Sequence, residues 1–377
     1  RSTIILTGAS GALGSQILRI LLDEHKDEVE SILLLVRAQD DSTAREKIAQ
    51  SFHQKRVAGL SEADFELIQF KAVDLANQDA VEALQLKELP NAIFVHAGWE
   101  VNFALGLASF KACLDGTVNL LQAHLSSSSS RFIFCSTIAS CLDSDKTSEI
   151  QETRARDPSS ASAVGYAQAK WVAEQICEKA AACSTGSGHH SVDVVRIGQL
   201  CGVRAHGVWN TREAWPLLVK TADEVGKLPD IQQRLDWLPV DTAARALLDL
   251  AFSKAGTPEA QETEGQASIF HLVDPHGKSA PSWQQFLEWL KQAGLHFETV
   301  SHQEWLDTIR EPKPPIQGSA LVDIWSKMGS GSQAPPTIDT SRMQVVSKSF
   351  QSSEPLDGKL FAHSVEYWRE IGFLKKH

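Results

Sequence analysis

The chain has 377 residues and a formal net charge of −11, with 42% hydrophobic and 22% charged residues. This balance is that of a globular protein, and it excludes disorder, collagen and coiled coil as descriptions of the whole chain. No apolar run reaches the ~18 residues of a membrane span. An acidic chain without a block of Lys and Arg is also a poor nucleic-acid binder, so we expect neither a membrane nor a nucleic-acid partner.

The six cysteines are scattered, at positions 113, 135, 141, 177, 183 and 201, without any Cys-x-x-Cys pair. This spacing suits neither a metal site nor a disulfide framework, so we expect no metal and a reducing, cytoplasmic location. The chain starts at Arg1 rather than at Met, and an apolar run follows at once. We therefore expect a domain cut from a longer polypeptide, monomeric when excised.

Short apolar runs alternate with stretches of helical periodicity over the first 275 residues. The predicted strands are Ser2–Leu6, Ser31–Val36, Leu67–Leu75, Ala92–Gly98, Arg131–Thr137, Val192–Ile197 and Ser268–Val273. The predicted helices are Gln16–Leu22, Phe103–His124, Gly165–Ala182 and Val240–Lys254. Such alternation predicts an α/β fold with a doubly wound parallel sheet of the Rossmann type.

The rest of the chain is richer in Trp and Pro and less regular. We expect residues 1–203 and 239–275 to form the cofactor-binding domain. Residues 204–238 and 276–377 would form a smaller, mainly helical C-terminal domain that faces the substrate. The serine run Ser126–Ser130 predicts a flexible surface loop, and Pro312–Pro315 and Gly329–Pro336 predict loops or hinges.

A glycine-rich turn, Thr-Gly-Ala-Ser-Gly-Ala-Leu-Gly, follows the first predicted strand and opens a helix. In such a turn Gly8 permits the tight bend, Gly11 lets the backbone approach a pyrophosphate, and Gly14 lets the helix pack on the strand. The helix N-terminus then faces the phosphate charge. The context favours dinucleotide binding over a turn without a ligand.

Basic residues follow the second predicted strand, where an NAD site usually has an acidic residue. Arg37 stands at the strand end, and a guanidinium there suits the 2′-phosphate of NADP. Arg45 and Lys47 follow on the next predicted helix and would add positive charge. The alternative is that these are solvated surface charges.

Two further strand ends offer ligand-facing residues. Asp74 and Leu75 are placed to meet the adenine, although an aspartate there is also a common turn former. His96 ends the fourth predicted strand, where a histidine more often satisfies backbone groups than performs catalysis. We expect it to line the cofactor site.

The pattern Tyr-x-x-x-Lys occurs at Tyr166 and Lys170, which places both side chains on one face of a helix. It follows the fifth strand, which ends in Thr137 at the carboxyl edge where open α/β sheets bind ligands. A nearby ammonium would favour the phenolate, so that Tyr166 acts as a general acid near neutral pH. Thr137 would hydrogen-bond a carbonyl oxygen as negative charge develops on it.

Together these motifs resemble the extended short-chain dehydrogenase/reductases. Three longer stretches, His96–Leu120, Gly165–Gln175 and Arg196–Trp215, are similar to the terminal thioester reductase domains of fungal adenylate-forming reductases. These enzymes resemble non-ribosomal peptide synthetases, and the similarity extends to carboxylic acid reductases and aminoadipate reductase. It covers residues 2 to 275 well and the last hundred residues weakly.

The resemblance implies an NADPH-dependent enzyme that releases a carrier-bound acyl group, as an aldehyde, from the phosphopantetheine of an upstream carrier domain. Thr137, Tyr166 and Lys170 would be catalytic, with Lys170 also holding the nicotinamide ribose. The implied cofactor-binding residues are Thr7, Gly8, Ser10, Gly11, Ala12, Leu13, Gly14, Arg37, Arg45, Lys47, Asp74, Leu75, His96, Ala97, Gly98, Ile197 and Gly198.

Tryptophans offer a possible site for an aromatic acyl group. Trp99 stands beside the expected nicotinamide cleft, where it would wall the substrate pocket or pack in the core. Trp209 and Trp215 raise the same alternatives. Two other functions stay open: an extended reductase or sugar-nucleotide epimerase acting on a free small molecule, and an inactive NADPH-sensing module. Retention of both Tyr166 and Lys170 argues against the second.

Overall fold

The computed structural model describes residues 1–89, 91–143, 149–184, 189–253, 265–310, 316–317, 319, 322, 325–326 and 336–375. The chain divides into two compact units. The first unit comprises Arg1–Gly198, Asp241–Pro275 and Pro336–Ser353, and the second comprises Gln199–Val240, His276–Pro335 and Glu354–His377. The predicted loops at Pro312–Pro315 and at 329–335 lie outside the described residues.

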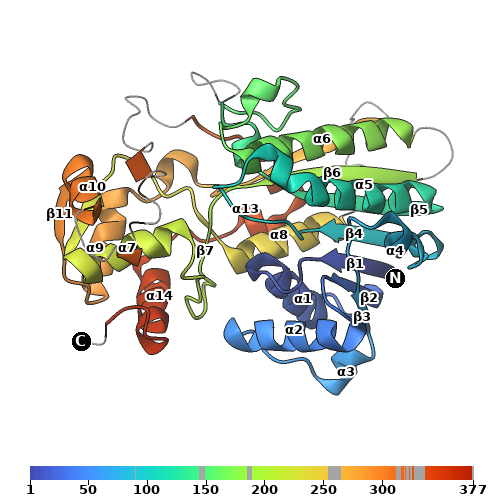
Figure 1. The fold of residues 1–377 in the computed structure, drawn as a ribbon, viewed down its shortest axis with the longest axis horizontal. Helices are drawn as coiled ribbons and strands as arrows, with labels where there is room; N and C mark the ends of the chain where they lie inside the picture. The colour runs from blue at the N-terminus through green and yellow to red at the C-terminus, as the bar shows by residue number, and fades with distance from the viewer. Residues whose placement is uncertain are drawn as a thin grey trace. The chain divides into compact units, whose positions relative to one another are not determined.

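The first unit is built on a parallel sheet of seven strands in the order β10-β6-β5-β4-β1-β2-β3 (Figure 1). Its strands are β1 (Ser2–Thr7), β2 (Val29–Val36), β3 (Ile68–Ala72), β4 (Ala92–His96), β5 (Ser129–Thr137), β6 (His189–Ile197) and β10 (Ser268–Leu272). Side chains of both faces, such as Ile4 and Ile5, are buried, as expected for a parallel sheet covered on both sides. The predicted doubly wound sheet is confirmed, and its order reverses between β1 and β4, where such sheets bind ligands.

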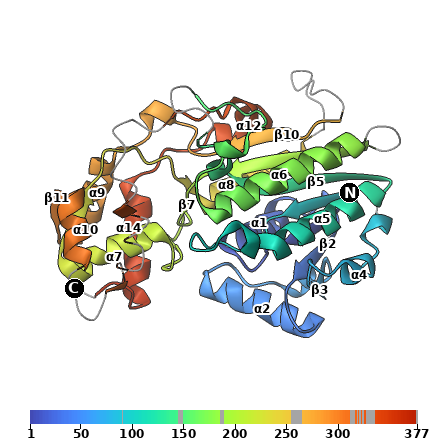
Figure 2. The same cartoon turned by 45° about the horizontal axis from the view of Figure 1, so that its top comes forward.

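Helices cover both faces of this sheet (Figures 1 and 2). One face carries α4 (Gln78–Glu82), α5 (Lys111–Ser126) and α6 (Gly165–Cys183), and the other carries α1 (Ala12–Glu24), α2 (Asp41–Gln54) and α8 (Val240–Phe252). Short helices α3 (Glu62–Phe65), α12 (Ser341–Val346) and α13 (Lys348–Gln351) complete the unit. Leu120 of α5 and Ala173 of α6 pack with Phe94 and Phe132 of the sheet. None of the helices within the described residues is long and apolar enough to cross a bilayer.

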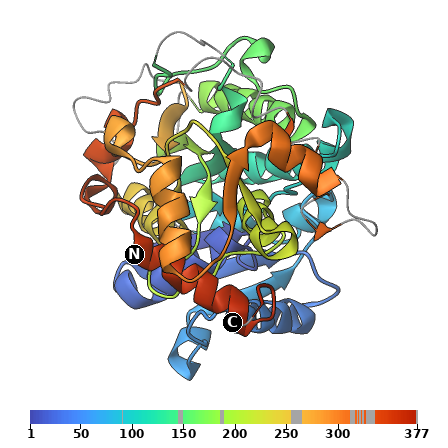
Figure 3. The same ribbon diagram turned by 90° about the vertical axis from the view of Figure 1, so that its left-hand side faces the viewer.

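The second unit is mainly helical, and its helices are visible in Figure 3. They are α7 (Ala214–Val225), α9 (Trp283–Gln292), α10 (His302–Arg310) and α14 (Gly358–Glu370). Two strand pairs accompany them: β8 (Lys227–Asp230) with β11 (Glu298–Ser301), and β7 (Leu200–Cys201) with β9 (Leu238–Pro239). The core of this unit is rich in tryptophan, with Trp237, Trp283 and Trp305 at most 1% exposed.

Two sequence-based expectations about local structure are corrected. The helix predicted from Phe103 begins only at Lys111, because the Asn102 side chain accepts the Ala104 N–H at 3.0 Å and holds a turn there. The serine run is not a loop, since α5 ends at Ser126 and β5 begins at Ser129. Ser130 is buried, and its hydroxyl lies 2.7 Å from Nδ1 of His124.

The unit boundaries also differ from the expected domains, because residues 336–353 belong with the first unit. Ile338 pairs with Ile150, and the N–H of Arg342 donates to the Glu152 carboxylate at 2.5 Å. The Ser347 hydroxyl donates to Asp249 of α8 at 2.6 Å. These contacts join residues about 100 to 190 positions apart in the chain, a separation that local sequence patterns do not report.

Candidate active site

The glycine turn joins β1 to α1 with no room for side chains. Gly8 has φ +77°, and a Cβ on it would lie 2.7 Å from the backbone nitrogen of Gly98. A Cβ on Gly14 would lie 2.1 Å from the Gly8 carbonyl oxygen. Helix α1 follows Gly11 without a side-chain cap, so its first backbone N–H groups are available to an anion. This cradle fits the pyrophosphate of a dinucleotide.

Two residues of the α2 region hold this turn from behind. The carbonyl of Ser10 accepts the Ser51 hydroxyl at 2.9 Å and the Lys55 ammonium at 3.0 Å. Burial lowers the pKa of Lys55 from its ordinary value of 10.5. Sequence reasoning missed both residues, because they stand more than 40 positions after Ser10 and carry no motif. Both residues hold the backbone of the glycine turn in position.

His96 connects the ends of β1 and β4. Its Nδ1 lies 2.8 Å from the Thr7 hydroxyl, which also accepts the Gly98 N–H at 2.9 Å. Its Nε2 lies 3.1 Å from the hydroxyl of Thr117, which itself donates to the Cys113 carbonyl. His96 must therefore donate from Nε2 and accept at Nδ1. Burial lowers its pKa to about 3, so the imidazole is neutral and serves structure rather than proton transfer.

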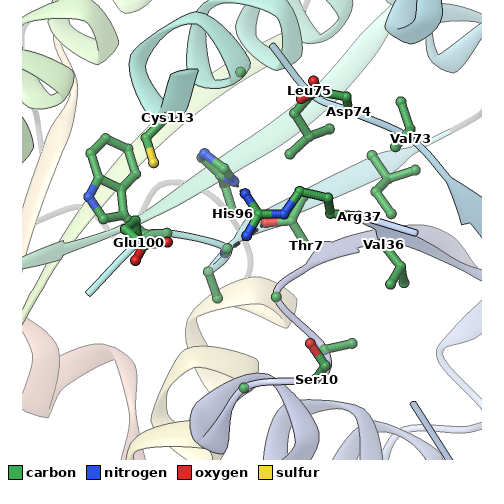
Figure 4. A pocket seen from close by; sticks show the side chains of 18 of the residues that line it. Thr7, Ser10, Val36, Arg37, Val73, Asp74, Leu75, His96, Glu100 and Cys113 are labelled. Atoms are coloured by element: carbon green, nitrogen blue, oxygen red, sulfur yellow. Dashed lines mark hydrogen bonds between the residues drawn. The ribbon is translucent and has the colours of Figure 1, made fainter. Parts of the chain in front are cut away.

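A pocket opens at the carboxyl ends of β1, β2, β3 and β4, where side chains from all four strand ends converge (Figure 4). The predicted cofactor and substrate residues that line it are Thr7, Gly8, Ser10, Gly11, Arg37, Lys47, Asp74, Leu75, His96, Ala97, Gly98 and Trp99. Val36, Val73, Glu100 and Cys113 also line it and were not predicted. Ala12, Leu13 and Gly14 lie in the first turn of α1, outside this lining.

The basic residues near the pocket separate into two groups. Arg37 lines the pocket, is exposed, and has no carboxylate partner within the described part of the chain. Lys47 also lines it and donates to the Arg37 carbonyl at 3.0 Å. Arg45 is not among the described residues that line this pocket; its guanidinium lies over the Phe65 ring, 3.9 Å from the centroid. Local periodicity does not reveal this cation–π contact with α3.

The residues predicted to face the adenine, Asp74 and Leu75, lie just after the end of β3. Asp74 lines the pocket, and its carboxylate also accepts the Ala76 N–H at 3.1 Å, so it forms the turn as well. The carbonyl of Leu75 accepts the Asn119 side chain at 2.8 Å. A Cβ on Gly116 would lie 2.8 Å from Leu75, so α5 approaches this segment closely. The wall formed by these residues is therefore fixed by α5.

Thr137 and Tyr166 meet at the carboxyl end of β5. Thr137 is the last residue of β5, Tyr166 is the second residue of α6, and the Thr137 side chain lies close enough to the phenol to influence its pKa. Burial raises the pKa of Tyr166 above its ordinary value of 10.0, and the Thr137 side chain only partly opposes this effect. The phenol is thus protonated at neutral pH, the state in which a general acid must start.

Lys170 lies one helical turn after Tyr166 and is 3% exposed. Its ammonium donates to the Cys135 carbonyl at 2.6 Å and lies 4.0 Å from the Trp99 ring centroid and 4.7 Å from that of Phe134. Burial lowers its pKa to about 7. We expected the ammonium to favour the phenolate, but here burial controls both groups and keeps Tyr166 protonated.

A buried ionic network lies directly behind Thr137, and sequence reasoning missed it. Glu174, one turn after Lys170, pairs with Arg196 of β6 at 2.8 Å, and both side chains are at most 3% exposed. Its carboxylate also accepts the hydroxyls of Ser136 at 2.5 Å and Ser140 at 2.6 Å. The available signal was the spacing 166, 170 and 174, which places all three side chains on one face of α6.

The remaining predicted residues take different places. Ile197 ends β6 in a buried position, and a Cβ on Gly198 would lie 2.6 Å from Val273. Trp99 lines the pocket and also packs against the core of the first unit. Of the two alternatives for Trp209 and Trp215, core packing describes their surroundings, because both lie in the hydrophobic core of the second unit, 3% and 8% exposed.

Comparison with known proteins places this site in a family. Residues 6–247 match the NAD-binding family described as male sterility protein. The chain belongs to this family. The match runs from β1 into α8 and so includes the glycine turn and all three predicted catalytic residues. As a member of the male sterility family, the chain is an NAD(P)-dependent oxidoreductase domain.

The curated relatives of this male sterility family domain are much longer proteins. The adenylate-forming reductase stbB of Stachybotrys bisbyi is 34% identical over 310 residues, which cover 78% of this chain and 28% of that protein. An adenylate-forming reductase of Aspergillus terreus is 27% identical over 414 residues, covering 99% and 36% respectively. The chain thus spans about a third of these relatives or less, and the predicted resemblance to adenylate-forming reductases is confirmed.

Solved structures agree on the fold. The terminal R domain from the myxalamid PKS-NRPS pathway superposes with a TM-score of 0.82 and 22% identity, covering 99% of this chain and 92% of that chain. A thiolation-reductase di-domain from an archaeal non-ribosomal peptide synthetase gives 0.76 and 17%, covering 99% and 76%. A UDP-glucuronic acid 4-epimerase from Bacillus cereus gives 0.62 and 16%, covering 98% and 97%. At such identities the likeness shows a shared fold.

Proposed function

We propose that this domain reduces an acyl thioester, carried on the phosphopantetheine of a carrier domain, and releases an aldehyde. The observation that carries the proposal is that the Thr137 side chain reaches the Tyr166 phenol closely enough to influence its pKa, with Lys170 buried one helical turn after Tyr166. Two adjacent hydroxyl donors suit a carbonyl oxygen that gains negative charge. The relatives' description as adenylate-forming reductases supports an activated acyl group as the substrate.

The chemistry follows from these side chains. Bound NADPH would supply the hydride that adds to the thioester carbonyl carbon. Thr137 and Tyr166 would donate to the carbonyl oxygen, and Tyr166 would transfer its proton to that oxygen. The resulting hemithioacetal breaks its C–S bond and yields an aldehyde and the carrier thiol. The balance is thioester, NADPH and one proton in, and aldehyde, thiol and NADP⁺ out.

The choice of NADPH over NADH rests on Arg37 and Lys47. Arg37 is exposed at the pocket without a carboxylate partner among the described residues, and Lys47 lies against its carbonyl. Two cations at this place suit a phosphate that only NADPH carries. Arg37→Ala should raise the Kd for NADPH about 10-fold or more and leave that for NADH nearly unchanged.

Arg45→Ala is the matched control for this measurement, because Arg45 is a nearby arginine whose guanidinium packs on Phe65. Titration calorimetry with both nucleotides should give the same ratio of the Kd for NADPH to the Kd for NADH in this variant as in the wild type. Equal weakening of NADPH and NADH by Arg37→Ala would show that Arg37 does not bind the extra phosphate.

The substrate class is tested by following NADPH oxidation with acyl-pantetheine thioesters and, separately, with a nucleotide sugar. We expect turnover of the thioesters and formation of aldehyde and free thiol in equal amounts. Turnover of the sugar alone would instead favour an epimerase or reductase of free small molecules, which share this fold. Faster reduction on a carrier domain than on free pantetheine would support a carrier as the partner.

A further inference from the structure

Exposed apolar side chains gather in one short segment of the first unit. Within the described residues the large apolar side chains that are well exposed are Val101 at 65%, Phe103 at 48%, Leu107 at 40%, Val345 at 57% and Ile371 at 48%. Three of these fall within seven residues, between β4 and α5. A single exposed apolar residue needs no explanation, but a contiguous group marks a binding surface.

This segment contacts the catalytic tyrosine. The Phe103 ring lies 5.1 Å from the Tyr166 ring between centroids, at an interplanar angle of 70°. The buried Phe110 ring lies 6.2 Å from the same ring. Tyr166 is thus packed against one phenyl ring that is part of the core and another that is open to solvent. The open ring of Phe103 therefore provides an exposed apolar surface in contact with Tyr166.

Backbone contacts fix the segment against α6. A Cβ on Gly165, the first residue of α6, would lie 2.3 Å from the carbonyl oxygen of Leu105 and 2.6 Å from the backbone nitrogen of Leu107. Because Gly165 lacks a side chain, the segment packs directly on the helical turn that carries Tyr166. The position of Phe103 relative to the tyrosine is therefore set by the fold, and no side chain intervenes.

We propose that Phe103, supported by Val101 and Leu107, determines acyl specificity and selects apolar, uncharged acyl groups. This inference rests on the proposed thioester reduction. A carbonyl held by the Tyr166 hydroxyl carries its acyl substituent on the next bond, which brings that substituent to the nearest open surface. Burying apolar area there is favourable by about 25 cal/mol per Å².

The charge of the segment supports the same selection. Between residues 97 and 110 the only charged residue is Glu100, which is exposed and lines the pocket. An anionic acyl group would meet a like charge and no cation within this segment. A charged acyl chain would also lose hydration against Phe103 without gaining a partner.

The test compares pantetheine thioesters of benzoate, hexanoate, acetate and succinate by NADPH consumption. For the wild type we expect the benzoyl and hexanoyl thioesters to have the highest kcat/KM and the succinyl thioester the lowest. Phe103→Ala should raise the KM for benzoyl and hexanoyl about 10-fold. The KM for acetyl, kcat and the Kd for NADPH should change less than about twofold, because acetate is too short to reach the ring.

Two further variants keep the inference falsifiable. Phe103→Leu retains an apolar surface and should keep most of the selectivity. Val345→Ala removes an equally exposed apolar side chain elsewhere in the same unit and should change nothing. If Phe103→Ala lowered kcat/KM equally for the acetyl and benzoyl thioesters, Phe103 would only support Tyr166. If the ratio of these two kcat/KM values stayed at the wild-type value and neither fell, Phe103 would have no role in acyl specificity. Failure of the wild type on every thioester would instead refute the proposed function itself.

Discussion

The two units bury different kinds of side chain. The first unit places Lys170, Glu174 and Arg196 in its interior, each at most 4% exposed. The second unit buries tryptophans, with Trp283 and Trp305 both at 0% exposure. Burial of a charge is costly unless its partners are in place, whereas burial of an indole is favourable by itself. The buried charged side chains, which are costly to desolvate, thus lie near Thr137 and Tyr166, and we expect them to hold these two side chains in place.

Substitutions in the two units should therefore affect different properties of the protein. In the first unit a change at the site should alter turnover, since the buried polar groups position Thr137 and Tyr166. In the second unit a change in the core should alter the free energy of unfolding, since its side chains contribute packing and a few indole hydrogen bonds. The four variants below test this division, from the largest expected effect to the smallest.

Tyr166→Phe should lower kcat by about 10²- to 10⁴-fold, because it removes the proton donor and keeps the ring. The Kd for NADPH and the melting temperature should stay close to the wild-type values. Tyr367→Phe is the matched control, since Tyr367 is the only other tyrosine and belongs to the second unit. Steady-state kinetics in which both variants turn over at the wild-type rate would remove Tyr166 from the reaction.

Glu174→Gln should lower the free energy of unfolding by about 3–5 kcal/mol, because Arg196 is left charged and buried without its carboxylate. It should also lower kcat, since the uncharged amide oxygen would hold the Ser136 and Ser140 hydroxyls, next to Thr137, less strongly than the carboxylate does. Urea unfolding measures the first effect. Asp115→Asn breaks an exposed ion pair with Lys111 on α5 and should cost about 1 kcal/mol or less.

Rescue separates positioning from stability in this network. Combining Glu174→Met with Arg196→Met removes both buried charges, so the free energy of unfolding should recover while kcat stays low. Recovery of both quantities together would mean that the ion pair supports folding alone. An unchanged kcat in Glu174→Gln would contradict the proposal that this network positions Thr137.

Trp283→Phe should cost about 1–3 kcal/mol of unfolding free energy, because the indole N–H donates to the buried Pro229 carbonyl at 2.8 Å. The Kd for NADPH and kcat should be unchanged at a temperature where the variant is folded. Trp289→Phe, at a half-buried indole stacked on Phe361, should cost less. A lower kcat in Trp283→Phe without a lower free energy of unfolding would contradict the idea that the core of the second unit affects stability and not turnover.

Glu213→Gln should have the smallest effect, and one that depends on pH. Burial raises the pKa of Glu213 from 4.5 to about 7, so the folded protein holds this proton more tightly than the unfolded chain. Its contribution to stability is present below pH 4.5 and falls as pH rises through 7. The glutamine still accepts the Trp209 N–H and does not ionise.

The unfolding free energy of the variant should therefore match that of the wild type near pH 4.5 and exceed it by about 1 kcal/mol at pH 8. This is less than the ~3 kcal/mol that the full pKa change would give, because the Glu213 side chain is only half-buried and solvent screens part of the effect. Unfolding curves across this range measure the difference. A constant difference at all pH values would show that Glu213 does not titrate in this range.

Local patterns predicted the parts of the site that lie close together in the chain. The glycine turn and the strand end at Thr137 were predictable because strand and helix periodicity is local. The pair Tyr166 and Lys170 was predictable because residues four apart share a helix face. By contrast, the contact of Lys55 with Ser10 spans 45 residues and carries no sequence signal. The packing of Arg45 on Phe65 was missed for the same reason.

The sequence by itself determined the parallel sheet, the glycine turn between strand and helix, and the placement of Tyr166 and Lys170 on one helix face, because spacing along one chain defines each of them. Only the tertiary structure decided which charges are buried, and hence that Lys170 has a pKa near 7 and that Tyr166 keeps its proton. It also decided that Phe103 lies open beside Tyr166. The physical reason is that solvation and pKa depend on neighbours in space, and folding brings those neighbours from distant parts of the chain.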